Sequence, residues 1–173
     1  MKWFLTLLAV VILAFVFLLV LRRPAHKGGA PIDGAAMALA FPLRAGGWTR
    51  IERRAADYPR TTEDRARRLV RELSAPDENP AVFAPLPETF PLRSIYLDGA
   101  RLYLDVSQAA LAELGGGTED ERIVLESLRR TLAWNLPDLE QLQILVDGRA
   151  RRTLGVVGED AGHVAVDFPI PLK

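Results

Sequence analysis

Hydrolysis could be supported by Ser107 as the nucleophile, His163 as its base, and a carboxylate from Asp105 or Asp167 that orients the histidine. The residues around Ser107 do not form the pattern of a nucleophile elbow. Ser107 follows a strand-like run and precedes a short helical segment, where a serine hydroxyl typically caps the helix. The sequence therefore predicts a helix cap at Ser107 and no catalytic residue.

Metal and cofactor chemistry has no better support. The chain has no cysteine and only two histidines, His26 and His163, and it contains neither a phosphate-binding glycine loop nor a zinc-ligand spacing. Asp105, Asp147 and Asp167 stand in turns or at the ends of strand-like runs, where carboxylates usually bond to nearby backbone. We therefore expect no metal, no cofactor and no enzyme activity.

Arginine is the residue type that could serve binding, and it gathers in two places. In the first cluster, around Arg65, Arg68 and Arg71, acidic residues are interspersed with the arginines. The default interpretation is a solvated helix face of mixed charge. The alternative is a surface for an acidic partner or anionic lipid. We expect no nucleic-acid partner. The candidate interaction surface consists of Arg65, Arg68 and Arg71 in the first cluster, and of Arg149, Arg151 and Arg152 in the second.

The elements that must position these residues begin with a strand pair and a helix. Residues 38–43 and 48–52 predict two short strands joined at Gly46-Gly47. Thr61 or Thr62 can cap a helix that extends to residue 73. Its apolar residues recur at helical spacing: Ala66, Leu69, Val70 and Leu73. Five prolines between residues 76 and 91 predict a loop after this helix.

The second half of the domain predicts a hairpin, a long helix and a strand. Residues 93–106 alternate around Asp98-Gly99, as in a hairpin. Thr118 and Glu121 form a capping-box pattern at the start of the long helix. One side of this helix carries Val124, Leu125, Leu128, Thr131, Leu132 and Asn135. Leu142, Ile144 and Val146 predict a strand that ends at the turn Asp147-Gly148. We expect an α+β fold in which two main helices pack on a mixed sheet.

The start of the chain predicts a membrane anchor. Trp3 to Leu21 is a run of 19 residues without a charge. As a helix it would span about 28 Å, close to the hydrocarbon thickness of a bilayer. The run is long for a signal peptide and ends without a small-residue cleavage site, so a retained anchor is favoured. We predict an anchor over residues 1–23, a flexible linker over 24–37 and one domain over 38–173.

The order of residues in the C-terminal half resembles the GerMN domain of sporulation and spore germination proteins. The matching positions are Leu104, Asp105, Ser107, Glu119, Glu121, Thr131, Leu132, Gly148, Gly162, His163, Asp167, Pro171 and Leu172. Residues 157–161 depart from the family pattern by lengthening the loop before Gly162. The resemblance implies a non-catalytic module of an envelope assembly, with a protein partner or self-association.

The flanking charges and the family resemblance disagree about the side of the membrane on which the domain lies. Arg22, Arg23 and Lys27 outnumber the positive charges before the anchor, which would weakly place the domain in the cytoplasm. The resemblance implies the opposite side, and we follow it. We expect a single-pass cell-membrane protein with an extracytoplasmic structural or interaction domain. The alternative is a module that binds peptidoglycan glycan or peptide, although Trp48 and Trp134 more often complete a core edge than stack on a sugar.

Overall fold

The residues on either side of the Gly46-Gly47 turn form a β-hairpin. In the computed structural model, strand β1 (Ala36–Pro42) pairs antiparallel with β2 (Trp48–Arg54), so β1 starts two residues before the predicted domain boundary. Gly46 and Gly47 have φ angles of +92° and +85°, a region that glycine adopts without strain. The structure describes residues 36–55, 57–90, 92–108, 117–153 and 164–173, which all fall in one unit of the chain.

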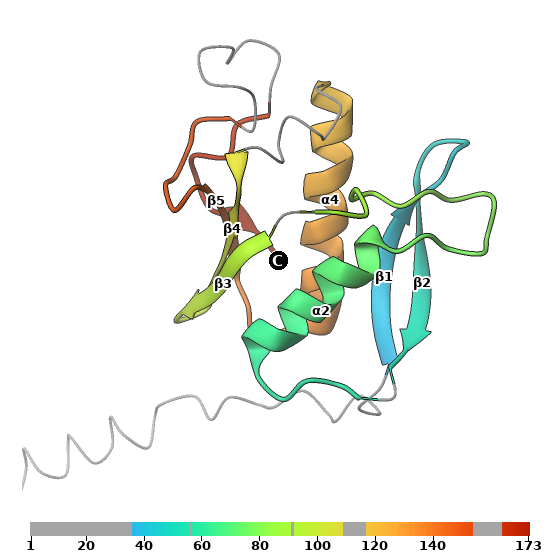
Figure 1. Ribbon diagram of the computed structural model, residues 1–173, viewed down its shortest axis with the longest axis horizontal. Coiled ribbons are helices and arrows are strands. Elements are labelled where there is room, and N and C mark those ends of the chain that lie inside the picture. Colours follow the sequence, from blue (N-terminus) through green and yellow to red (C-terminus); the bar gives the residue numbers. More distant parts are fainter. Residues whose placement is uncertain (1–35, 56, 91, 109–116, 154–163) are drawn as a thin grey trace, which may run out of the picture. The chain divides into compact units, whose positions relative to one another are not determined.

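The other strands form a second sheet in the order β3-β4-β5-β6 (Figure 1). Strands β3 (Leu92–Asp98) and β4 (Arg101–Val106) form the predicted hairpin, with Gly99–Ala100 as its loop. Strand β5 (Gln141–Val146) is parallel to β4, and β6 (Ile170–Pro171) is antiparallel to β5. The α+β class and the mixed sheet are confirmed, and β1 and β2 form a separate two-stranded sheet that was not predicted.

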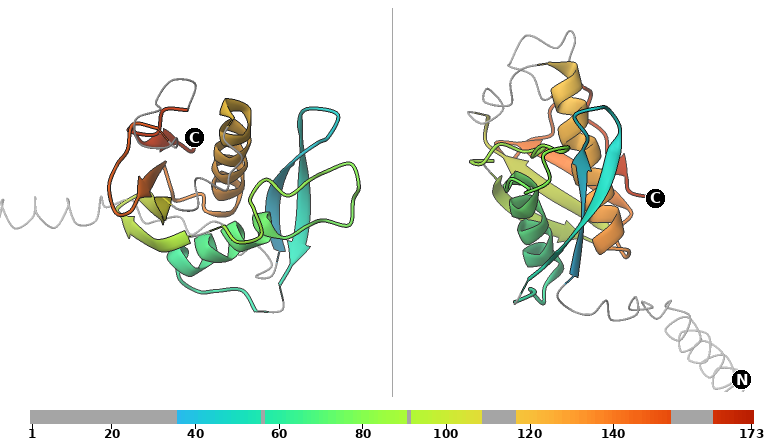
Figure 2. Two further views of the ribbon diagram at one scale, coloured as in Figure 1. Left: turned by 45° about the horizontal axis from the view of Figure 1, so that its top comes forward. Right: turned by 90° about the vertical axis from the view of Figure 1, so that its right-hand side faces the viewer.

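Two helices lie between the hairpin β1-β2 and the four-stranded sheet (Figures 1 and 2). Helix α2 (Thr62–Ser74) has Thr61 as its N-cap, and the Thr61 hydroxyl accepts a hydrogen bond from the Asp64 N–H at 3.1 Å. Helix α4 (Thr118–Asn135) packs against β1. The predicted apolar sides of both helices are buried, and they share one core with the inward residues of the sheet, including Leu102, Leu104, Leu142 and Ile144. Burial of these side chains is the main favourable term in the stability of the fold.

The start of α4 differs from the predicted capping box. Thr118 is the first helical residue, and the N-cap is Gly117, which has no side chain to accept a hydrogen bond. Glu121 is buried, and its Oε2 accepts a hydrogen bond from the Val164 N–H at 2.7 Å. The carboxylate therefore fastens the helix start to the C-terminal segment, and residue spacing within the helix could not reveal that contact.

Several predicted features lie wholly or partly outside the described residues. These are the run Trp3–Leu21, most of the linker, the helical segment after Ser107, and residues 157–161. Of the positions that match the family after residue 161, Asp167, Pro171 and Leu172 are described, and Ala165 forms an isolated bridge with Thr153. Within the part of the chain that the structure describes, no helix is long and apolar enough to cross a membrane.

Two arginine–tryptophan contacts join β2 to α4. The guanidinium carbon of Arg50 lies 5.4 Å from the ring centre of Trp134, and that of Arg130 lies 5.4 Å from the ring centre of Trp48. Such contacts are typically worth about 0.5–1 kcal/mol each at partly exposed sites. Glu126 holds Arg130 in place, since the Arg130 Nε donates to its carboxylate at 2.5 Å. Each tryptophan ring is therefore covered by an arginine from the other element.

Glu126 should make the stability of the domain depend on pH in the acid range. Hydrogen bonds from Arg129 and Arg130 outweigh partial burial and lower the pKa of Glu126 from 4.5 to about 2. Because this pKa is lower in the folded state, its stabilisation is complete above pH 4.5 and is lost as the pH falls toward 2.

The Glu126→Gln variant tests this pH dependence. Near neutral pH we expect it to be about 1 kcal/mol less stable than the wild type, since the ion pairs are partly solvated. The difference should vanish below about pH 2. Urea unfolding across this pH range measures it, and a difference that does not change with pH would contradict the role of the carboxylate.

Candidate functional site

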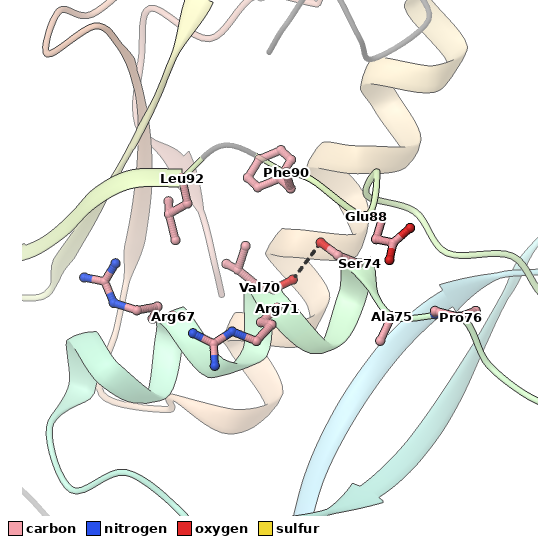
Figure 3. A pocket seen from close by; sticks show the side chains of 9 residues that line it. All are labelled: Arg67, Val70, Arg71, Ser74, Ala75, Pro76, Glu88, Phe90 and Leu92. Atoms are coloured by element: carbon pink, nitrogen blue, oxygen red, sulfur yellow. Dashed lines mark hydrogen bonds between the residues drawn. The ribbon is translucent and has the colours of Figure 1, made fainter.

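A groove of about 430 Å³ opens between α2 and the segment that leads into β3 (Figure 3). Helix α2 supplies one wall, and Glu88, Phe90 and Leu92 supply the other. Val70 at the helix side is 3% exposed, so the floor of the groove is continuous with the core. The lining residues are Arg67, Val70, Arg71, Ser74, Ala75, Pro76, Glu88, Phe90 and Leu92.

The local sequence explains both walls of the groove. Arg67, Val70, Arg71 and Ser74 are three or four residues apart, so they form one stripe on α2. The facing wall is a turn held by its own backbone, in which the Phe90 N–H donates to the Pro87 carbonyl at 3.0 Å. The Leu92 N–H donates to the Phe90 carbonyl, also at 3.0 Å. An apolar wall, formed by Phe90 and Leu92, therefore faces an arginine-bearing stripe.

The two arginines of the groove differ from Arg65 and Arg68 on α2 in having no partner among the described residues. Arg67 and Arg71 make no hydrogen bond or ion pair with the described residues. The Arg68 Nε lies 2.9 Å from Glu72 Oε1, an ion pair without hydrogen-bond geometry. Arg65 donates from Nε to a backbone carbonyl at 2.9 Å. Arg65 and Arg68 therefore stabilise the fold, whereas Arg67 and Arg71 remain available to a ligand.

A second hollow of about 400 Å³ extends the positive surface toward the start of α2. Arg67 and Arg71 line both hollows, and Arg60 and Asp64 line only the second. Glu88 lies at the opposite end of the groove, beside the C-terminal end of α2 (Figure 3). The groove is therefore positive at one end, apolar along one wall and negative at the other end.

The second predicted arginine cluster lies apart from the groove. Arg149 and Arg152 are exposed after β5, and the Arg151 Nη2 donates to Gln108 Oε1 at 2.7 Å. Of the six arginines predicted as an interaction surface, Arg71 alone lines the apolar groove. Sequence reasoning did not single out Arg67, although its spacing of four residues from Arg71 was a usable signal. The contributions of Glu88 and Phe90 depend on how the proline-rich loop folds.

The residues considered for catalysis are not shown to form a site. His163 lies outside the described residues. Asp105 is 6% exposed, and its Oδ1 accepts a hydrogen bond from the Gly148 N–H at 2.7 Å, so its backbone partner is 43 residues away and not nearby in the chain as predicted. Asp147 pairs with Arg93 Nη1 at 2.7 Å. Among the described residues, no three acidic, histidine or cysteine side chains lie close enough to hold a metal ion.

Three solved structures share the fold. The first GerMN domain of the sporulation protein GerM from Bacillus subtilis is 15% identical, with 75% of this chain and 96% of that chain covered and a TM-score of 0.56. A structure of the tandem GerMN domains of the same protein is 16% identical over 85% of this chain, with a TM-score of 0.57; this chain covers 49% of it. A Clostridium perfringens protein described as a candidate lipoprotein is 18% identical, with 81% and 89% covered and a TM-score of 0.54.

The sequence itself identifies the family. No curated protein sequence matches the chain. The family model named Germane, described as sporulation and spore germination, matches residues 41–152. This range contains both helices and the strands β2 to β5, so the match covers most of the described fold. The chain belongs to the Germane family of sporulation and spore germination domains.

Proposed function

We propose that this chain is a non-catalytic, membrane-anchored domain of the bacterial envelope that binds a partner protein through the groove between α2 and the wall of Glu88, Phe90 and Leu92. The observation that carries the proposal is that Arg67 and Arg71, which bond to none of the described residues, lie opposite an apolar wall. Guanidinium groups bind carboxylates with charge-assisted hydrogen bonds, and an apolar wall adds affinity by burial. The groove therefore suits an acidic protein segment with apolar neighbours.

The membrane anchor and the location are parts of the same proposal. The uncharged run from Trp3 to Leu21 has the length of a transmembrane helix. The Clostridium perfringens protein of the same fold is described as a candidate lipoprotein, which supports an anchored domain outside the cytoplasm. A reporter enzyme that is active only outside the cytoplasm, fused after Lys173, should be active. Activity of a cytoplasmic reporter alone would reverse the proposed orientation.

Charge reversal in the groove tests the binding proposal. In the double variant Arg67→Glu/Arg71→Glu, we expect partner recovery to fall at least about tenfold, since two charge-assisted contacts become repulsive. The melting temperature should stay within about 3 °C of the wild type, because Arg71 is exposed, Arg67 is only half-buried, and such arginines contribute under about 1 kcal/mol to stability. Cross-linking of the full chain in membranes of its own host, followed by quantitative mass spectrometry, measures the recovery.

The matched control is Arg149→Glu/Arg152→Glu, which reverses the same charge on the second cluster. This control should retain the partner. If the control loses the partner and the groove variant keeps it, the interaction surface lies after β5 and the groove proposal is wrong. Recovery with purified peptidoglycan is measured in parallel, and retention of peptidoglycan without any protein partner would favour a cell-wall-binding module.

A further inference from the structure

The groove lies beside an open edge of the four-stranded sheet. Strand β3 is the last strand on its side, and none of the described strands pairs with its outer edge. Leu92, the first residue of β3, lines the groove and points toward Val70 of α2 (Figure 3). Helix α2 packs against β3. The groove therefore ends at the first residue of β3, beside this strand edge.

The hairpin loop determines which backbone groups of β3 face outward. Asp98 and Arg101 flank a two-residue loop, and in such hairpins the flanking pair is hydrogen-bonded. Hydrogen-bonded and non-hydrogen-bonded pairs alternate along antiparallel strands, so Tyr96 also bonds to β4. By the same alternation, Ile95 and Leu97 direct their N–H and C=O groups away from β4. These groups form a row that can pair with a further strand.

In a strand added at this edge, every second side chain would point toward the groove. Side chains alternate between the two faces of a strand, and the face that contains Ile95 is the one covered by α2. The inward side chains of the added strand would therefore lie near Val70, Arg67 and Arg71. The pairing of β3 with β4 is irregular only between Leu92 and Ser94, so the rest of the edge keeps a regular strand.

We infer that an extended segment of a partner protein adds to β3 as a further strand and inserts an acidic side chain between Arg67 and Arg71. The inference rests on the proposed function and specifies its binding mode and chemistry. In strand addition, main-chain hydrogen bonds give affinity and pockets for alternate side chains give specificity. Here the two uncompensated guanidinium groups select an acidic residue, and Phe90 and Leu92 select an apolar residue two positions away along the segment.

The probe is a synthetic peptide, acetyl-Thr-Leu-Thr-Asp-Thr-Leu-amide, which places its leucines and aspartate on one face when extended. Binding to the full chain in detergent micelles is measured by fluorescence anisotropy of a labelled peptide. Exchange of the aspartate for lysine should weaken binding at least about tenfold. N-methylation of the peptide's backbone nitrogens that face β3 should also weaken binding at least about tenfold. N-methylation of the nitrogens that face away from β3 should change the affinity less than about threefold.

Amide hydrogen exchange locates the bound peptide. Exchange of the Ile95 and Leu97 amides should slow at least about tenfold when the peptide binds, whereas the Tyr96 amide, which already bonds to β4, should not change. The groove variant Arg67→Glu/Arg71→Glu should lose both binding and protection. The variant Arg149→Glu/Arg152→Glu should retain both.

The possible failures of the two proposals can be told apart. If the peptide needs Arg67 and Arg71 but leaves Ile95 and Leu97 unprotected, and both N-methylated sets bind, the groove is a binding site and strand addition is wrong. If purified muropeptides protect these amides and the peptide does not, the ligand is cell-wall peptide and the inference is wrong. If the peptide fails to bind the wild type, strand addition of an acidic segment is also wrong, and recovery of the partner by cross-linking separately decides the proposed function.

Discussion

Replacement of Asn135 by leucine is expected to destabilise the domain by about 3–5 kcal/mol, because it leaves two backbone groups buried without partners. Asn135 is 5% exposed, its Oδ1 accepts a hydrogen bond from the Ala38 N–H at 3.0 Å, and its Nδ2 donates to the Ala38 carbonyl at 2.6 Å. Leucine has a similar volume but cannot replace either bond. Ala38 itself is 6% exposed, so water has little access to the orphaned groups.

Urea unfolding of the wild type and the Asn135→Leu variant measures this loss. The matched control is Thr131→Val, one turn earlier on α4, which removes only the hydrogen bond from the Ala40 N–H to Thr131 Oγ1 at 3.0 Å. We expect the control to lose about 1–3 kcal/mol, less than Asn135→Leu. A loss below about 1 kcal/mol for Asn135→Leu would mean that Ala38 finds other partners and that the bridge is not needed.

These two side chains also explain why β1 does not join the larger sheet. Thr131 and Asn135 lie on the side of α4 that faces β1, and they bond to alternate residues of the strand, Ala40 and Ala38. Their side chains form hydrogen bonds with the backbone at the edge of β1, as a neighbouring strand would otherwise do. Sequence reasoning placed both residues on the buried side of the helix. Only the structure shows that these two polar residues bond to the backbone of β1.

The correct predictions were those that depend on neighbours in the chain. The Asp147-Gly148 pair predicted a tight turn, and its φ angles of 51° and 75° are those that a type I′ hairpin turn requires. The N-cap at Thr61 and the hairpin around Gly99 follow equally local rules. The Germane family was also identified correctly, because an ordered set of residues survives where overall identity is low.

The features that sequence reasoning missed depend on contacts between distant residues. Glu121 was assigned to a cap and instead binds Val164, 43 residues away. The candidate site was predicted in part: Arg71 lines the groove, but Arg65 and Arg68 turn back to groups of the fold itself. A charge pattern shows which residues can reach a partner. It does not show which of them already have one.

Arg53 gives the second large expected effect, since the Arg53→Met variant should be destabilised by about 2–4 kcal/mol. Its guanidinium lies over the ring of Phe41 and donates to the Glu72 and Pro76 carbonyls, each at 3.0 Å, at the C-terminal end of α2. It also forms ion pairs with Glu72 at 3.2 Å and Asp77 at 3.0 Å. The variant would leave unpaired carbonyls and two neighbouring carboxylates without this counter-charge.

The Arg53→Lys variant separates charge from geometry. Lysine keeps the positive charge but cannot bond to several carbonyls and carboxylates at once through a planar fork, so we expect it to recover about half of the loss. Urea unfolding of both variants measures this. Ala75 and Pro76 line one end of the groove, and Arg53 Nη2 bonds to both carbonyls, at 3.4 and 3.0 Å. Arg53→Met, studied where it remains folded, should therefore also weaken partner binding. Unchanged stability and binding in Arg53→Met would show that the end of α2 holds its position without this arginine.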